Sequence, residues 1–294
     1  MAVAVSLSCG ALASENGQTH YPVGVDTIMS GVMPAPGQTQ FYLYTQHYRS
    51  DRTNDSAGRS LDPGFNVEVQ AFVPRVMHTW QRRAGPFQMS SGALLPFTRV
   101  RLRAFGQEGS STGAGDLVLF PLYLGYVNPT GTVFAYGGPV IYAPTGKYDE
   151  NRLANNGLNY WSIAPTMGVT WLPHPRWELS AGANLEFNRK NSATDYRSGH
   201  SAMLDFGVGV RPLAGHPKLK IAAQGFGLVQ FTDDRQHGAV VGDGHRGRAF
   251  GFGPQVSYDI AGGRGGMVLK YQREFGVENR TEGERFWFMF TMPL

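Results

Sequence analysis

Apolar side chains recur at every second position over most of this sequence, which is the period of β-strands with one apolar and one polar face. The clearest example is the C-terminal segment, where Phe286, Phe288 and Phe290 share one face and Arg285 and Trp287 share the other. About twelve segments show this pattern, near residues 39–48, 65–79, 86–96, 115–127, 131–143, 159–172, 176–188, 199–213, 218–232, 248–261, 266–277 and 283–294. Most exceed the roughly 5 or 6 residues of a globular strand and reach the roughly 9 to 11 that a tilted membrane strand needs.

The connections between these segments alternate between long and short. Long polar loops are predicted at residues 49–64, 97–114, 144–159, 189–198 and 233–247, and short turns at 81–84, 128–130, 173–175, 214–217 and 262–265. Outer membrane β-barrels have long loops at one end and short turns at the other, whereas a soluble β-sandwich, the alternative, has no reason to alternate. We therefore expect an all-β fold: a transmembrane, antiparallel, up-and-down β-barrel of about 12 strands over residues 39–294, in the bacterial outer membrane, with both termini at the short-turn end.

The composition favours a β-barrel over a membrane helix, and it argues against nucleic-acid binding. Residues 117–146 carry no charge, but Asn-Pro-Thr-Gly at 128–131 interrupts them, so we expect two strands and a turn rather than one membrane helix. A closed barrel pairs every backbone group inside lipid, and its polar lumen explains a mean hydropathy of −0.26. The net charge of +4, without a dense Lys/Arg run, argues against nucleic acid as a partner.

The first 38 residues precede the strand pattern. Residues 1–13 are uncharged and apolar and end in a small-x-small sequence, which predicts a signal peptide cleaved before Ser14. The single cysteine, Cys9, lies within it, so the mature chain is expected to have neither a disulfide nor a thiol metal site; lipid attachment at Cys9 is the alternative. Residues 14–38 are predicted either to enter the barrel as a lumen plug or to form a disordered periplasmic leader.

Six short motifs follow one another along the chain: His20-Tyr21-Pro22-Val23-Gly24, Pro34-Ala35-Pro36-Gly37, Gly113-Ala114-Gly115-Asp116, Tyr142–Asp149, Asn159-Tyr160-Trp161 and Tyr196–His200. In order and spacing they resemble the bacterial outer membrane family named for the meta-pathway of phenol degradation. The resemblance implies a porin-like channel or transporter for passive uptake of small hydrophobic or aromatic compounds. The expected partners are this solute, outer membrane lipid and the barrel-assembly machinery, for which the aromatic C-terminal strand is similar to the usual insertion signal.

The motif loops supply one set of candidate site residues: Gly113, Gly115, Asp116, Pro144, Thr145, Gly146, Tyr148 and Gly199. The glycines and prolines stand where loops meet strands, so unusual backbone angles are their expected role. Asp116 is expected either to cap a loop or to bind an ion.

A second set of polar residues is expected to line the lumen and the solute path: Glu68, Gln70, Arg75, Asn184, Glu186, Asp205, Gln224, Gln255, Lys270, Gln272 and Arg285. Twelve strands lie between the eight that side chains fill and the sixteen that leave an aqueous channel, so the lumen should be narrow. Arg75, Lys270 and Arg285 come from strands that closure makes neighbours, whereas Glu186 and Asp205 lie opposite. We expect a transverse electric field across the pore; ordinary cross-strand salt bridges are the alternative.

Two stretches of the sequence match enzymatic motifs, but neither lies in the structural context that its motif requires. Residues 109–113 fit a nucleophile elbow and residues 242–247 a dinucleotide fingerprint, but both lie in predicted loops between strands. Outer membrane lipid hydrolases resemble one another in placing His and Ser two residues apart on a strand, and none of the 8 histidines has Ser at that spacing. The histidines are scattered singly, so we expect no metal, no cofactor and no enzymatic activity. A structural or adhesive barrel without transport is the first alternative, and a lipid-modifying enzyme the second.

Overall fold

The structure is a computed structural model that describes residues 18–213, 215–260, 262 and 264–294. Its named elements in these ranges are all β-strands. None of the described residues forms a helix with the length and apolar character needed to cross a membrane. The predicted signal peptide, residues 1–13, lies outside the described residues, as does the beginning of the segment 14–38.

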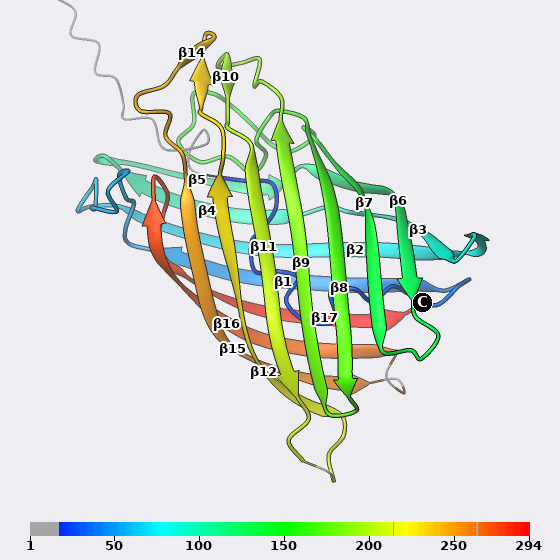
Figure 1. Cartoon of the computed structure of the whole chain (residues 1–294). Coiled ribbons are helices and arrows are strands. Elements are labelled where there is room, and N and C mark those ends of the chain that lie inside the picture. Colours follow the sequence, from blue (N-terminus) through cyan, green and yellow to red (C-terminus); the bar gives the residue numbers. More distant parts are fainter. Residues whose placement is uncertain (1–17, 214, 261, 263) are drawn as a thin grey trace, which may run out of the picture.

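Twelve antiparallel strands close into a barrel (Figure 1). They are β1 (Thr39–Ser50), β2 (Asn66–Ala84), β3 (Phe87–Leu94), β6 (Leu117–Val127), β7 (Val133–Ala143), β8 (Ser162–His174), β9 (Trp177–Asn188), β11 (Ser201–Val210), β12 (Leu219–Gln230), β15 (Arg248–Ile260), β16 (Gly265–Glu278) and β17 (Glu284–Pro293). The ring closes because β1 pairs with both β2 and β17. In Figure 1 the strands of the near wall cross those of the far wall steeply, as the tilt of barrel strands requires. The predicted fold class and strand number are confirmed.

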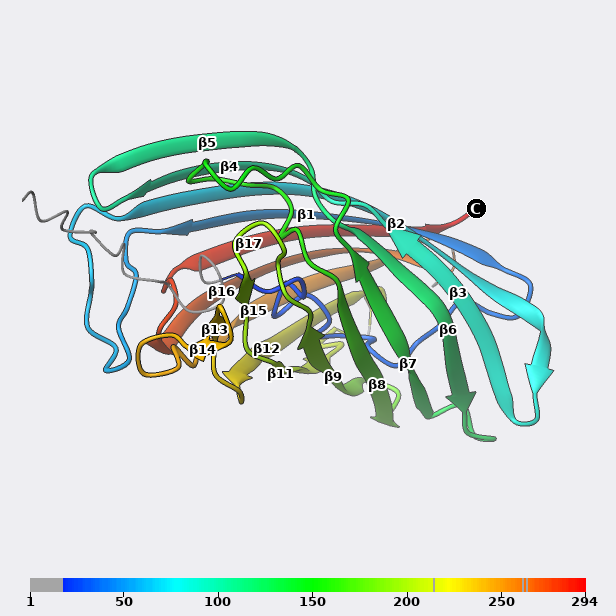
Figure 2. The same ribbon diagram turned by 90° about the horizontal axis from the view of Figure 1, so that it is seen from above.

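One predicted loop is wrong. Residues 97–114 form a hairpin of β4 (Phe97–Ala104) and β5 (Gln107–Ala114) rather than a polar loop. This hairpin extends the hairpin of β3 and β6 beyond a break at Leu95 and Pro96, and β4 pairs with the first half of β2. Figure 2 shows the extension projecting with the long loops. A signal was present in the sequence, because apolar residues alternate with arginines from residue 98 to residue 104.

The two ends of the barrel differ, and we name them by their connections. At the long-loop end, long segments follow β1, β7, β9 and β12, and a small sheet of β10 (Tyr196–Arg197), β13 (Arg235–Gln236) and β14 (Ala239–Val240) lies among them. At the short-turn end, a few residues join β2 to β3, β6 to β7 and β8 to β9. The first residue of β1 and the last of β17 lie at this end as well, because these antiparallel neighbours pair Gln40 with Pro293.

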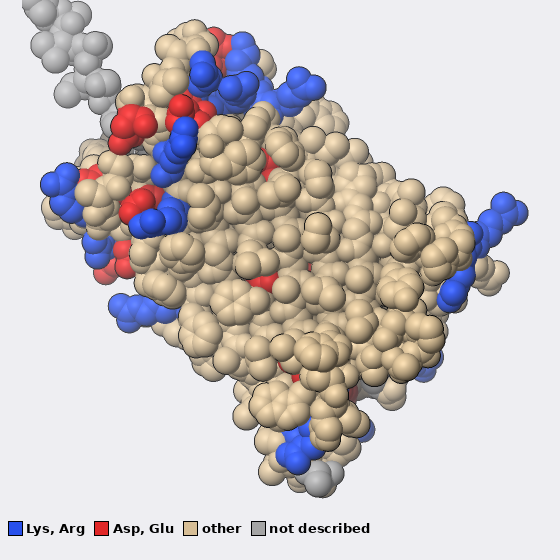
Figure 3. Space-filling view, viewed as in Figure 1, with Lys and Arg blue, Asp and Glu red and all other residues tan. Residues whose placement is uncertain are grey.

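The outer face of the wall carries a broad apolar band. Its side chains include Met167, Leu269 and Phe286, which are 63%, 59% and 54% exposed. Figure 3 shows one side of this band, with Lys, Arg, Asp and Glu gathered toward its ends. Apolar side chains exposed to this extent are stable when lipid covers them, as in transmembrane barrels.

On β2 the predicted direction of two side chains is wrong. Arg75 faces the lumen, and strand alternation therefore turns Glu68 and Gln70 to the outer face. There Glu68 forms an ion pair with Arg101 at 3.3 Å. The reason is that this half of β2 lies at the long-loop end, where Val67 and its apolar neighbours pack inward and polar side chains face outward.

Candidate functional site

Nine predicted lumen residues do face the interior. They are Arg75, Asn184, Glu186, Asp205, Gln224, Gln255, Lys270, Gln272 and Arg285. Six of them, Glu186, Asp205, Gln255, Lys270, Gln272 and Arg285, form hydrogen bonds with residues 18–38, which run between the walls and which we call the inner segment (Figure 2, dark blue). The lumen is therefore occupied by the protein's own chain, at the residues where sequence reasoning placed a solute path.

The carboxylates of one wall accept hydrogen bonds from the inner segment. Asp205 on β11 accepts from the backbone N–H of Gly24 at 2.8 Å and of Asp26 at 2.9 Å, and from the Tyr21 hydroxyl at 2.7 Å. Glu186 on β9 accepts from the backbone N–H of Tyr21 at 3.1 Å. Both carboxylates are fully buried, so these charge-assisted bonds replace water around them.

Cations on β16 and β17 donate to backbone carbonyls of the same segment. Lys270 on β16 donates to the carbonyls of Gly24 and Val25 at 2.5 Å and 2.8 Å. Arg285 on β17 donates to the carbonyl of Val23 at 2.7 Å and also pairs with Glu274. The inner segment thus presents N–H groups to the carboxylates and carbonyl groups to the cations. The transverse field stays a prediction, because Arg285 pairs with Glu274 on the neighbouring strand, as the salt-bridge alternative expects.

Neutral amides complete this contact. Gln272 donates to the carbonyl of Gly24 at 3.1 Å and to Gln224 at 2.5 Å, and Gln255 accepts from the hydroxyl of Thr27 at 3.0 Å. Asn184 instead donates to Thr166 within the wall at 2.8 Å. Two of the four predicted amide residues, Gln255 and Gln272, are therefore partners of the inner segment.

The wall is also shaped to admit the segment closely. A Cβ atom at Gly207 on β11 would lie 2.3 Å from the carbonyl oxygen of Thr27, closer than atoms approach. A Cβ atom at Gly168 on β8 would likewise lie 2.5 Å from the carbonyl oxygen of Ser30. Glycine at these inward positions is what allows two backbones to touch.

His20 fastens the inner segment at the long-loop end. Its Nδ1 lies 3.2 Å from a Glu186 oxygen and its Nε2 lies 3.4 Å from Asp116. The ring stacks on Tyr142 at 4.8 Å and meets Tyr160 edge-on at 4.9 Å. Burial lowers the pKa of His20, but the carboxylates of Asp116 and Glu186 outweigh it and raise the pKa to about 9. His20 is therefore a buried cation that connects its own sequence motif with three others, through Asp116, Tyr142 and Tyr160.

Asp116 ties together the loops of the motif set. Its carboxylate accepts from the backbone N–H of Gly146 at 2.9 Å and of Leu158 at 2.8 Å, while the Thr145 hydroxyl accepts from the N–H of Leu117 at 3.0 Å. A Cβ atom at Gly146 would lie 2.7 Å from the carbonyl carbon of Gly115. Asp116 thus caps loops, which is one of its two predicted roles.

The remaining motif residues are placed in the same region. Pro144 directly follows β7, and Gly113 lies on β5 beside Lys147. The Tyr148 hydroxyl accepts from Asn191 at 2.9 Å, and the N–H of Gly199 donates to Asp234 at 2.6 Å. Sequence reasoning identified the motifs but not that Asp116, Tyr142 and Tyr160 meet at His20, because these contacts join segments far apart in the chain.

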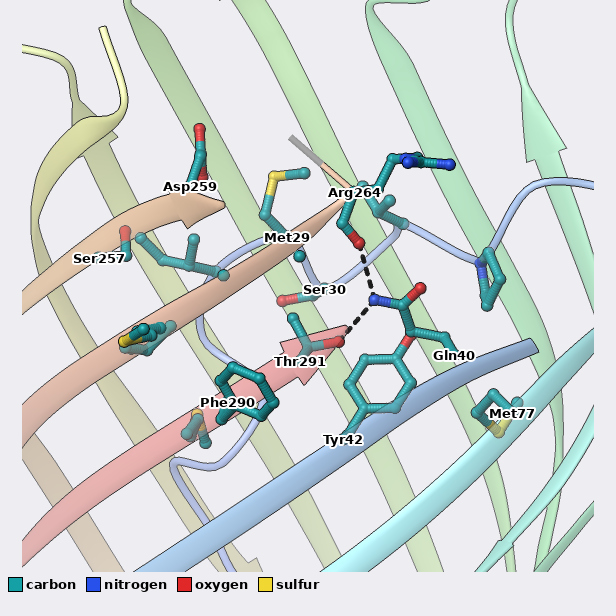
Figure 4. Close-up of a pocket in the computed structure, with 18 of the residues that line it drawn as sticks. Met29, Ser30, Gln40, Tyr42, Met77, Ser257, Asp259, Arg264, Phe290 and Thr291 are labelled. Atoms are coloured by element: carbon teal, nitrogen blue, oxygen red, sulfur yellow. Dashed lines mark hydrogen bonds between the residues drawn. The ribbon is translucent and has the colours of Figure 1, made fainter. Parts of the chain in front are cut away.

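A cavity of about 370 Å³ lies between the inner segment and the wall toward the short-turn end. Figure 4 shows part of its lining, in which Gln40 donates to the carbonyl of Arg264 and to the hydroxyl of Thr291, both at 2.8 Å. Deeper in, the cavity is lined by aromatic, thioether and charged side chains: Tyr42, Tyr44, Tyr136, Met33, Met77, Asp26 and Arg75. Such a lining suits a small solute that is mostly apolar with one polar group.

Metal chemistry has no visible site in the part of the chain that the structure describes. No group of three or more His, Cys, Asp or Glu side chains is arranged there to hold an ion.

Comparison with known proteins supports the fold. Residues 50–290 match the family model described as putative MetA-pathway of phenol degradation. An outer membrane channel from Pseudomonas putida F1 has a similar structure, with a TM-score of 0.78, 18% identity and coverage of 90% of this chain and 97% of that chain. The β domain of the Bordetella autotransporter BrkA gives a TM-score of 0.54 at 14% identity, covering 86% and 98%. No curated protein matches in sequence.

Proposed function

The chain belongs to the family described as putative MetA-pathway of phenol degradation, and we propose that it is an outer membrane channel for passive uptake of small hydrophobic or aromatic compounds. The predicted family resemblance is thereby confirmed. The fold is that of outer membrane barrels, and the Pseudomonas putida F1 protein of similar structure is described as a channel.

The cavity at the short-turn end is the observation that carries this proposal. It adjoins the lumen wall and has an aromatic and apolar lining, with Tyr42, Tyr136 and Met77 beside a few polar groups. A cavity of this size accommodates a single-ring compound rather than a sugar chain or a peptide.

The inner segment serves in this proposal as a plug. Its bonds to Asp205, Glu186, Lys270 and Arg285 hold it across the lumen, so a solute must pass beside it or displace it. Outer membrane lipid covers the apolar band, and the barrel-assembly machinery recognises the aromatic strand β17. The chain has no enzymatic role in this proposal.

A structural or adhesive barrel is the second candidate, because one observation favours it. Charged and amide side chains of six strands are bonded to the inner segment or to each other, and a filled lumen is what a purely structural barrel would have. The two candidates differ in one measurable property, the entry of solute.

Uptake by whole cells distinguishes them. Deleting the gene should slow the entry of radiolabelled toluene several-fold when its concentration limits uptake, and the gene in trans should restore it. Uptake of a small sugar is the control and should not change. Equal toluene uptake with and without the gene would favour the structural barrel.

A further inference from the structure

Arg75 is a partly buried cation for which the described residues supply no close counter-ion. Among the described residues its one hydrogen bond runs from Nη1 to the Tyr44 hydroxyl at 3.1 Å, and no described carboxylate lies within 4.0 Å of its nitrogens. Its Nε is buried without a hydrogen-bond partner. A buried donor without an acceptor costs free energy, so such a group points to a ligand that supplies one.

Three other cations of the lumen have close partners. Lys220 pairs with Glu178, Arg285 pairs with Glu274, and Lys270 donates to two carbonyls and a hydroxyl of the inner segment. Arg75 therefore differs from its neighbours in the chemistry that surrounds it, since Tyr44 is its sole hydrogen-bond acceptor among the described residues.

Aromatic rings surround the guanidinium of Arg75. Its central carbon lies 4.4 Å from the ring centroid of Phe120 and 5.2 Å from that of Tyr42. Nearby, Tyr123 and Tyr136 stack at 4.7 Å. The cation and the rings of Tyr42 and Tyr136 line the cavity at the short-turn end, so a ligand there meets a charge and aromatic faces together.

We propose that this cavity binds an aromatic carboxylate, with its carboxylate on Arg75 and its ring among the tyrosine and methionine side chains. The proposal rests on the proposed function, since it names a substrate class for the same lumen. A carboxylate fits because a guanidinium binds it through two parallel N–H groups, and the Nη1 bond to Tyr44 leaves the Nε side of the fork without an acceptor. Lysine, a point charge, has no such edge.

Asp26 is the competing anion in the cavity. Its carboxylate accepts from the Tyr136 hydroxyl at 3.2 Å, which holds it on the β7 side. Burial raises the pKa of Asp26 to about 6, against the opposing charge of Arg75. The charged groups that act on it are Arg75 from β2, Asp205 from β11 and Lys270 from β16. Binding of an anion should therefore tighten as the pH falls through 6, where Asp26 becomes neutral.

Binding of benzoate to the folded full-length barrel in detergent tests the proposal, measured by ligand-observed NMR titration. Replacing Arg75 with Met (Arg75→Met) keeps the apolar stem and removes the charge, and should weaken benzoate binding about tenfold or more. Arg75→Lys keeps the charge without the fork and should give an intermediate loss. Arg99→Met, on the outer face of β4, is the matched control and should bind as the unmodified protein does. Heat-dependent gel mobility reports whether each variant is folded, and Arg75→Lys carries the test if Arg75→Met does not fold.

Toluene, which has the ring without the carboxylate, separates this inference from the proposed function. Cells that produce Arg75→Met should still take up toluene while the purified variant has lost benzoate binding. If the unmodified protein does not bind benzoate, or binds it as well as Arg75→Met does, the inference is overturned while toluene uptake still supports a channel. If benzoate binds through Arg75 but toluene uptake does not depend on the gene, the binding site stands and the proposed function fails.

Discussion

The inner segment contacts the barrel differently at its two ends. At the long-loop end His20 lies between Asp116 and Glu186, and two aromatic rings enclose it. At the short-turn end the same segment borders a cavity of about 370 Å³ in which Arg75 has one hydrogen bond. One end is a packed polar network, and the other is a space lined by a cation that has no carboxylate within 4.0 Å.

This difference indicates how a plugged barrel can bind a solute. A polar network in a low-dielectric interior resists separation, because each buried group loses its partner when the network opens. A cavity costs little to fill and loses no protein contact when a ligand enters. We therefore expect the long-loop end to hold the segment in place and the short-turn end to accept or release solute.

The largest expected effect is an all-or-none difference in thiol labelling, which tests how the two ends are oriented in the membrane. A cysteine in place of Ser56, in the loop after β1, should react with an impermeant thiol reagent on whole cells. A cysteine in place of Arg83, at the end of β2, should react after the outer membrane is permeabilised. Both residues are exposed in the structure, so access to the reagent is the variable. The reverse pattern would exchange the two ends and contradict the topology.

Replacing the inner segment should give the next largest effect. With residues 18–38 exchanged for a Gly/Ser chain of equal length, Glu186, Asp205, Lys270 and Arg285 lose their bonds and water enters around them. Single-channel conductance in planar bilayers should rise several-fold. The matched control exchanges residues 51–61 of the loop after β1 in the same way. If the two exchanges raise conductance equally, the segment is not the obstruction.

The fold was predictable because a membrane wall imposes one rule on twelve strands. Inward side chains are polar and outward side chains apolar wherever lipid covers the wall, so alternation and length suffice. The rule fails on β2 and β4 at the long-loop end, where lipid no longer sets the outer face. There Val67 and Leu102 pack inward while Glu68 and Arg101 pair outside, and sequence reasoning assigned the wrong face or no strand at all.

The site was predictable in its residues but not in its connections. Lys270, Arg285, Glu186 and Asp205 were identified as lumen charges because each stands on the polar face of a strand. Their partners come from a segment without periodicity, whose path nothing local in the sequence specifies. His20 was missed as a site residue for the same reason, although it stands in the first of the six motifs.

A smaller effect is expected from pH at the long-loop end. With a pKa of about 9 in place and about 6.5 when released, protonated His20 favours the held segment by about 3 kcal/mol. That contribution is complete below pH 6.5 and is lost as the pH rises through 9. Conductance should therefore rise between about pH 7 and 9, and His20→Ala should raise it at neutral pH and remove the dependence. His78→Ala, at an exposed histidine of the short-turn end, is the control. A pH profile unchanged in His20→Ala would show that His20 does not fasten the segment.

The smallest effect concerns the charge of Lys270. Because its ammonium group is bonded to the carbonyls of Gly24 and Val25, the inner segment masks it from ions in the lumen. Lys270→Glu in the complete chain should move the reversal potential in a salt gradient only slightly toward cation selectivity. The same substitution in the chain whose inner segment is replaced should move the reversal potential further. The side chain at position 270 is then no longer masked by the segment, and passing ions come closer to its charge. Equal shifts in the two backgrounds would mean that ions reach Lys270 despite the segment, and that the transverse field acts on the pore directly.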